Sequence, residues 1–342
     1  MTQVTERISN GRPRELPTAA DFPRHPATWY LFCRSSLIDR RPHSRHLFGR
    51  SLVAFRTESG SVAVLDASCA HLGADLGRGR VCRETIQCPF HHWSYSADGN
   101  CVSVPGSVRV PTTARLRSYP AVERHGYIFF FLGPEPLFEL PFFEDCDPVD
   151  FAASPSFEFP MDCPWFMLVG NGFDGQHFQA VHDRRLTSTP RVDCPAPFAR
   201  RMQFEAEVAG TTIFDHLLRR FAGKIVKVSI TTWGGPYVLV EGEFERAHSR
   251  LLVASRPIDE NNTTSEVIAF ARRGSQFFSS HVLDPLSLRI RRRFTQAFLQ
   301  YDIDKLCGVR YQPAGLTDQD FELTQYFRWL TTLPRSEYEE PA

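Results

Sequence analysis

The chain has 342 residues, of which 42% are hydrophobic and 23% charged, and its 39 basic and 39 acidic side chains give a formal net charge of zero. This balance is typical of a globular protein with one large or two medium domains. It gives no electrostatic reason to expect nucleic acid or an anionic membrane as the partner. The longest apolar runs, such as residues 127–133, are as long as a strand and too short to span a membrane. The polar N-terminus lacks the apolar core of a signal peptide, so we expect a cytoplasmic protein without membrane insertion.

Short strands are predicted for the N-terminal third of the chain. Residues 50–56 and 61–66 flank a polar turn, which predicts a hairpin. Residues 84–104 read as two strands joined at Asp98–Gly99. Residues 126–133 close the region, which we expect to be a small all-β domain.

The pattern changes in the second half. Residues 136–163 are rich in proline, phenylalanine and acidic residues, and we expect a connection packed on a surface. Residues 165–186 look mainly helical, residues 200–272 alternate as strands do, and helices are predicted over 284–311 and 318–330. This half is therefore α+β, with an antiparallel sheet.

The chain is predicted to divide into five segments. They are a lead-in at 1–26, an all-β domain at 27–135, a connecting segment at 136–163, an α+β domain at 164–335 and a tail at 336–342.

The nine cysteines are an odd number spread along the chain, which argues against a disulfide framework. Four of them fall between Cys69 and Cys101, where we expect Cys82 and Cys101 to be structural. The five isolated cysteines are expected to be small buried hydrophobic residues; they are Cys33, Cys146, Cys163, Cys194 and Cys307.

The first group of metal-ligand candidates is Cys69-x-His71, followed after 16 residues by Cys88-x-x-His91. Two cysteines and two histidines suit a tetrahedral zinc ion. Zinc fingers, however, usually pair cysteine with cysteine, whereas each arm here carries one cysteine and one histidine. That division favours a Rieske-type [2Fe–2S] cluster, in which both cysteines bind one iron and both histidines the other.

The second group is His177 and His182, which with a later carboxylate suit a facial triad on a non-haem Fe(II) that binds O₂. Residues five apart on an α-helix lie about 140° apart around its axis. The helix must therefore bend, or break near Ala180, for both imidazoles to reach one iron. The third ligand is Asp302 or Asp304, and we prefer Asp302 because it borders the apolar side of its predicted helix.

The loops CAHLGADL and CPFHHWSY closely resemble the two cluster-binding loops of Rieske non-haem iron oxygenases. Asp174, His177, His182 and the order of the two sites resemble the catalytic (α) subunits of this family. The similarity extends over nearly all of 29–330.

Within the family, the stretches LFGRSLVAFR, QCPFHHW, GNCVSVPG and YDIDK are similar to aminopyrrolnitrin oxygenases, and the 3-ketosteroid 9α-hydroxylases are more distantly similar. The YDIDK match supports Asp302 as the third iron ligand.

The resemblance implies an N-terminal all-β Rieske [2Fe–2S] domain and a C-terminal catalytic domain of the helix-grip type, built from an antiparallel sheet and helices. It also implies a head-to-tail homotrimer. Asp174 is expected to bridge His91 of one copy and His177 of the next, which fixes both imidazoles and couples the two sites. Electrons would come from NAD(P)H through a ferredoxin, a flavin reductase or both.

The favoured activity is mono-oxygenation of a hydrophobic small molecule, aromatic or polycyclic, with O₂ as co-substrate. Arylamine N-oxygenation, desaturation and oxidative cyclisation use the same centres and stay open. A Rieske electron carrier without oxygenase activity is a different class, against which the motif at 171–182 argues. A zinc-stabilised binding module is a third.

Overall fold

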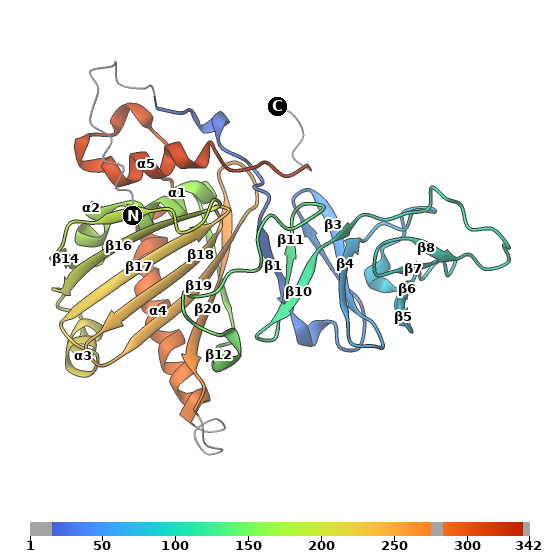
Figure 1. Ribbon diagram of the computed structural model, residues 1–342, viewed down its shortest axis with the longest axis horizontal. Coiled ribbons are helices and arrows are strands. Elements are labelled where there is room, and N and C mark those ends of the chain that lie inside the picture. Colours follow the sequence, from blue (N-terminus) through green and yellow to red (C-terminus); the bar gives the residue numbers. More distant parts are fainter. Residues whose placement is uncertain (1–15, 275–282, 338–342) are drawn as a thin grey trace.

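The computed structural model describes residues 16–274 and 283–337. The N-terminal domain contains three small antiparallel sheets, and the C-terminal domain contains a single large sheet (Figure 1). Across the described ranges, no helix is long and apolar enough to cross a membrane.

The three small sheets form the all-β domain. The first has the order β1-β11-β10, made of β1 (Trp29–Arg34), β10 (Ala121–Arg124) and β11 (Tyr127–Phe131). The second, β2-β3-β4-β9, contains β2 (His43–Leu47), β3 (Arg50–Arg56), β4 (Val62–Asp66) and β9 (Ser118–Tyr119). The third runs from β5 to β8, which are β5 (Arg80–Cys82), β6 (Thr85–Gln87), β7 (Ser94–Ser96) and β8 (Cys101–Ser103).

The predicted hairpins are confirmed in this domain, with one addition. β3 pairs with β4, and β7 pairs with β8 around the Asp98–Gly99 turn, where Gly99 has a φ of 84° that favours glycine. The segment 84–104 contains three strands and not two, because the loop Cys88–Trp93 separates β6 from β7.

The large sheet has nine antiparallel strands in the order β12-β20-β19-β18-β17-β16-β14, with β13 also paired to β20 and β15 to β16. The strands are β12 (Phe151–Ala153), β13 (Phe157–Met161), β14 (Arg184–Leu186), β15 (Arg191–Asp193), β16 (Ala199–Val208), β17 (Ile225–Trp233), β18 (Tyr237–Phe244), β19 (His248–Pro257) and β20 (Thr263–Arg272). β12 and β13 come from the segment 136–163, so the second half of the expected connection belongs to this sheet.

In the described part of the chain, five α-helices accompany the large sheet, and in Figure 1 α4 runs behind it. They are α1 (Trp165–Gly170), α2 (Gly175–Ala180), α3 (Ile213–Phe221), α4 (Asp284–Leu306) and α5 (Phe321–Leu330). Short 3₁₀ turns are η1 (Ala19–Asp21), η2 (Ser35–Leu37), η3 (Leu76–Arg78), η4 (Pro148–Asp150), η5 (Asn171–Phe173), η7 (Pro313–Gly315) and η8 (Asp318–Asp320).

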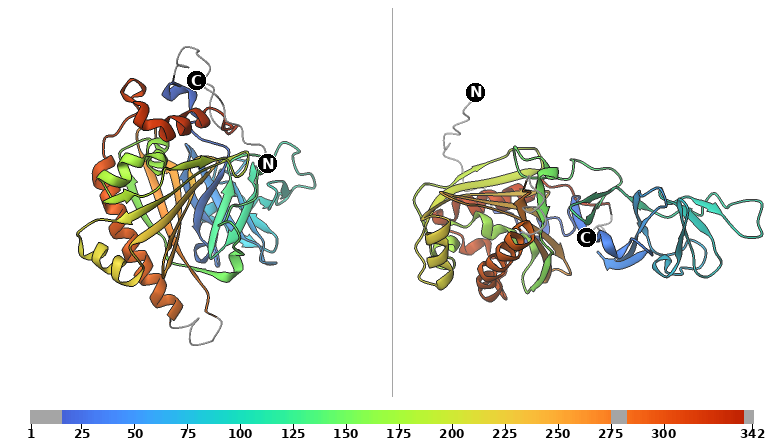
Figure 2. Two further views of the ribbon diagram at one scale, coloured as in Figure 1. Left: turned by 60° about the vertical axis from the view of Figure 1, so that its left-hand side comes forward. Right: turned by 90° about the horizontal axis from the view of Figure 1, so that it is seen from below.

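The two faces of the large sheet bury different partners. Tyr237 and Leu239 of β18 pack with Trp29 and Phe129 of the first small sheet. Their neighbour Val238 points the other way, into the cluster beneath α1 and α5. Side chains that alternate along β18 therefore contact the N-terminal domain on one face of the sheet and the helices on the other. The result is an elongated molecule with the β5–β8 sheet at its far end (Figures 1 and 2).

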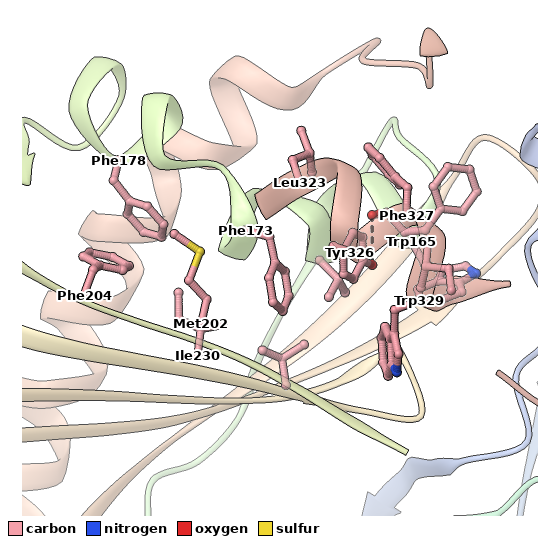
Figure 3. Close-up of a cluster of buried hydrophobic side chains, with 14 of the residues drawn as sticks. Trp165, Phe173, Phe178, Met202, Phe204, Ile230, Leu323, Tyr326, Phe327 and Trp329 are labelled. Carbon is pink, nitrogen blue, oxygen red and sulfur yellow. Dashed lines mark hydrogen bonds between the residues drawn. The ribbon is translucent and has the colours of Figure 1, made fainter. Parts of the chain in front are cut away.

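A core of aromatic side chains holds α1, η5 and α2 between α5 and the sheet (Figure 3). Phe173 stacks on Tyr326 with ring centroids 4.7 Å apart, and the Tyr326 hydroxyl donates to the carbonyl of Phe166 at 3.1 Å. A Cβ on Gly172 would lie 2.9 Å from Ile230 Cγ2, so the segment approaches the sheet more closely than any other residue allows. This core fixes the position of the helix that follows.

All nine cysteines are free thiols. Of the isolated cysteines predicted to be buried, Cys33 and Cys163 are buried and Cys146 is half-buried. The prediction is wrong for Cys194 and Cys307, which are exposed. Both lie in loops outside the packed layers, where the alternation of the strands does not determine burial.

Candidate functional site

The helix α2 begins and ends where the second motif requires. Asp174 is its N-cap, and Asp174 Oδ1 accepts from the backbone N–H groups of Gln176 at 2.9 Å and His177 at 3.1 Å. The helix ends at Ala180, which confirms the predicted break. His177 lies within α2 and His182 lies beyond its end, so the 140° offset of a continuous helix does not apply.

Three donor atoms from two distant segments of the chain meet here. His177 Nε2 is 2.9 Å and His182 Nε2 is 3.0 Å from Asp302 Oδ1, and the two nitrogens are 3.1 Å apart. Donor atoms held about 2.1 Å from one ion at right angles to one another lie about 3.0 Å apart. All three residues are buried. The arrangement therefore fits one metal ion bound on a single face.

The carboxylate of Asp302 has the electrostatics of a metal ligand. Its Oδ1 is buried and accepts no hydrogen bond of normal geometry, although two imidazole nitrogens lie within 3.0 Å. Burial alone would raise the pKa of Asp302, but the adjacent His177 and His182 outweigh it and hold the pKa below its usual range. An ionised oxygen without a donor, facing two imidazoles, is suited to a cation. Asp304, by contrast, is exposed and accepts from Gln300 Nε2 at 3.0 Å.

Two groups around the triad were not identified from the sequence. Phe298, one turn before Asp302, stacks on His182 with ring centroids 4.0 Å apart and planes 9° from parallel. Arg184 Nη1 donates to the carbonyl of His182 at 2.7 Å and to Asp215 Oδ1 at 2.9 Å. Phe298 is four residues before Asp302, a spacing that places both on one side of a helix, and this pattern could have identified it. The Arg184–Asp215 pair joins residues 31 apart, and no local pattern in the sequence indicates it.

The triad lies at the wall of an apolar cavity of about 880 Å³ between the large sheet, α3 and α4. Alternate residues of β17, β18 and β19 form its sheet wall, among them Val228, Ile230, Val238, Val240, Leu251 and Val253. A cavity of this size and lining is typical of a site for a hydrophobic small molecule.

The first ligand group lies in two loops: Cys69 and His71 are between β4 and η3, and Cys88 and His91 are between β6 and β7. Cys69 and Cys88 are buried, whereas His71 and His91 are exposed, with their ring centroids 4.7 Å apart. His71 also stacks on Trp93, with planes only 3° from parallel. The thiols thus face the protein and the imidazoles face outward.

Tyr95 supports the buried side of this group. Its hydroxyl lies 3.1 Å from Cys69 Sγ and accepts from the backbone N–H of Ala70 at 3.1 Å. Burial, followed by the contact with Cys69, raises the pKa of Tyr95 far above its usual value, so the phenol stays protonated and can donate to sulfur.

The spacing of the donors differs between the two groups. Among the residues that the structure describes, His177, His182 and Asp302 are the one set of three ligand atoms that all lie within 4.8 Å of one another. The donors of a tetrahedral zinc site lie about 3.3–3.8 Å apart, given metal–ligand distances of about 2.0–2.3 Å. No three of the donor atoms of Cys69, His71, Cys88 and His91 lie that close together, so as placed they do not form a tetrahedral site for one ion.

The structure does not bring the two groups together within one chain. The β5–β8 sheet, whose β6 and β7 flank the loop with Cys88 and His91, lies at one end of the molecule, and α2 with α4 lies at the other (Figures 1 and 2). Asp174 is next to the triad in sequence and half-buried.

Comparisons with known proteins agree with this division. Residues 28–120 match the model of the Rieske [2Fe-2S] domain family. Aminopyrrolnitrin oxygenase PrnD of Pseudomonas fluorescens is 40% identical over 166 residues, which cover 46% of this chain and 46% of that protein. A 3-ketosteroid-9-alpha-monooxygenase oxygenase component of Rhodococcus rhodochrous is 38% identical over 123 residues, which cover 36% of this chain and 32% of that one. The matches thus span half or less of the length of these relatives.

Solved structures share the fold over most of the chain. Dicamba monooxygenase bound to dicamba has a TM-score of 0.62 at 19% identity and covers 90% of this chain and 96% of its own. The NdmA QL mutant of Pseudomonas putida CBB5 with theobromine has a TM-score of 0.65 at 19% identity, and covers 90% of this chain and 89% of its own.

Proposed function

We propose that this chain is a Rieske oxygenase α subunit and that it uses O₂ and electrons from an NAD(P)H-linked reductase or ferredoxin to mono-oxygenate a hydrophobic aromatic or polycyclic molecule. The observation that carries the proposal is the buried His177, His182 and Asp302 triad at the wall of an apolar cavity, in a chain with a Rieske domain at 28–120.

In this proposal each protein group has a definite task. Cys69, His71, Cys88 and His91 hold a [2Fe–2S] cluster, and His177, His182 and Asp302 hold Fe(II). When bound, the cluster would supply single electrons, and the Fe(II) would supply open coordination positions for O₂. Phe298 fixes the ring plane of His182 by stacking and Arg184 fixes its backbone. The apolar walls position the substrate and exclude water.

Asp174 is proposed to connect two copies of the chain. Its Oδ1 accepts both backbone N–H groups at the start of α2, which leaves Oδ2 for an imidazole N–H of His91 in a second copy. Because the two ligand groups lie at opposite ends of one chain, a head-to-tail ring such as a trimer would bring them together. We include this assembly, and a cytoplasmic location consistent with nine free thiols, in the proposal.

Arylamine N-oxygenation is the second candidate, favoured by the 40% identity to aminopyrrolnitrin oxygenase. An electron carrier would need neither the triad nor the cavity.

The test is a single turnover of chemically reduced protein under ¹⁸O₂ with a panel of polycyclic hydrocarbons, phenols and arylamines. The expected product carries one labelled oxygen atom. A panel that yields no oxygenated product, or oxygen derived only from water, would contradict the proposal, and a labelled nitroso or nitro product would favour the second candidate.

A further inference from the structure

The cavity extends from the triad along one face of α4. Arg291 and Asp302 both line it and are eleven residues apart, which is about three turns and about 16 Å of rise. Their side chains therefore leave the helix within about 20° of each other. Thr295 and Phe298, which also line the cavity, lie between them on this face.

Arg291 differs from the other charged residues of the cavity wall. It donates to Ser287 Oγ at 3.2 Å and to the carbonyl of His248. Within the described ranges, it has no carboxylate in ion-pair contact. Burial, followed by the nearby charge of Arg250, lowers its pKa. A half-buried guanidinium that contacts only neutral groups is electrostatically unfavourable, because the charge loses hydration without gaining an opposite charge. An anionic ligand would supply that opposite charge.

The other arginines nearby are already matched. Arg184 lines the same cavity at its metal end, and Asp215 neutralises it at 2.9 Å. Arg250 is paired with Glu241 at 3.0 Å. Among the described residues, the uncompensated positive charge of the cavity is thus that of Arg291, three turns from the triad.

The Arg291 end of the cavity is also its apolar mouth. Phe221 of α3 and Leu286 and Ile290 of α4 line the cavity and are 69%, 51% and 49% exposed. Phe214 of α3 contacts Phe294 of α4 with ring centroids 5.2 Å apart. A molecule that enters between α3 and α4 would pass apolar side chains and leave its outer end beside Arg291.

We propose that the substrate is an elongated monocarboxylate. Its apolar ring system reaches the His177–His182–Asp302 end, and its carboxylate is bound by Arg291, whose position on α4 is about 16 Å of helix rise from Asp302. The inference rests on the proposed function and adds the acidic group and its position to it. Arg291 is a specificity-determining residue in this account: its planar guanidinium suits a carboxylate better than a neutral amide of the same shape.

The test uses the fluorescent probe 1-pyrenebutanoate and its neutral analogue 1-pyrenebutanamide. Both are titrated against metal-loaded, oxidised protein without any electron donor. The wild-type chain is expected to bind the carboxylate at least about tenfold more tightly than the amide. Arg291→Met is expected to bind the two probes equally, by weakening the carboxylate alone, and Arg291→Lys to retain some of the preference.

Arg293→Met is the matched control, because Arg293 is on the same helix, exposed and outside the cavity wall. Circular dichroism and a thermal melt establish that each variant is folded. Equal wild-type affinity for the two probes, no binding of the carboxylate, or an equal loss in Arg293→Met would overturn the proposal. Because binding needs no turnover, such a result would leave the oxygenase proposal standing, and failed turnover would leave the carboxylate site standing.

Discussion

At the residue scale, Asp302 and Asp304 illustrate how a helix separates two adjacent candidates. Residues two apart are about 200° apart around the helix axis, so only one can face the cavity. Sequence reasoning preferred Asp302 because it borders the apolar side. In the structure its carboxylate lies beside both imidazoles, and Asp304 is exposed. The role of Asp302 as a metal ligand is still a prediction.

Asp302→Ala is expected to lose the mononuclear iron and keep the cluster, because two imidazoles alone bind Fe(II) weakly and the cluster loops are remote. Iron content and the visible spectrum of the purified variant measure both. Asp304→Ala, two residues away, is the control and should keep the full metal content. Iron loss from Asp304→Ala instead would show that the wrong carboxylate was chosen.

Asp174 has two roles that substitution can separate. Asp174→Asn keeps an oxygen that caps α2 but removes the charge, whereas Asp174→Ala removes both and costs about 1 kcal/mol in unfolding free energy. Both variants are expected to bind both metals and to lose nearly all coupled turnover. A steady-state assay with reductase, beside urea unfolding, distinguishes the roles. Normal turnover in Asp174→Asn would refute the inter-subunit relay.

At the element scale, a buried ion pair attaches α3 to the loop that carries His182. The side chains of Arg184 and Asp215 are 10% and 8% exposed, and Asp215 also closes the capping box at Thr212. The pKa of Asp215 is lowered, because Thr212 and Arg184 together outweigh the effect of burial. One residue pair thus positions both the cavity mouth and a metal-ligand candidate.

Asp215→Ala is expected to lower the unfolding free energy by about 3–5 kcal/mol, because it leaves the Arg184 guanidinium buried without a carboxylate. Urea unfolding measures the loss. Glu207→Ala is the control: its partner Arg185 is 68% exposed, so the change should be below about 1 kcal/mol. Equal losses in the two variants would contradict this role of the buried pair.

The sequence predicted the elements better than the contacts between them. Alternation predicted the hairpin of β3 and β4, and the spacing of His177 and His182 predicted the end of α2 at Ala180. The segment 136–163 was expected to be a connection because it is rich in proline. It contains β12 and β13, two short strands that pair with β20. The shape of the cavity depends on how β17–β19 pack against α4, and no local pattern in the sequence predicts that packing.

At the scale of the whole molecule, the two domains share a hydrophobic interface that includes the half-buried His125. His125 contacts Phe142 and Phe270, and its Nε2 has no hydrogen-bond partner. Burial, followed by the charges of Arg124 and Arg273, lowers the pKa of His125 to about 4. The folded state therefore holds this imidazole neutral where an unfolded chain would protonate it.

The sign of the pH dependence follows from this shift. An unfolded histidine has a pKa of about 6.5, so the stability contribution of neutral His125 is complete above about pH 6.5 and is lost as the pH falls toward about 4. His125→Asn, which tolerates the local φ of 55°, should show a smaller fall in unfolding free energy between about pH 7 and pH 5. His46→Asn at an exposed site should match the wild type, and an unchanged slope in His125→Asn would contradict the account.

The central claim is that one chain carries both a Rieske cluster and a mononuclear iron. Iron and acid-labile sulfide analysis of anaerobically purified protein, with the absorption spectrum, tests it most directly. We predict about three irons and about two sulfides per chain and a brown protein. About two irons and two sulfides that persist after incubation with Fe(II) would indicate an electron carrier, and zinc without sulfide would contradict the account of both sites.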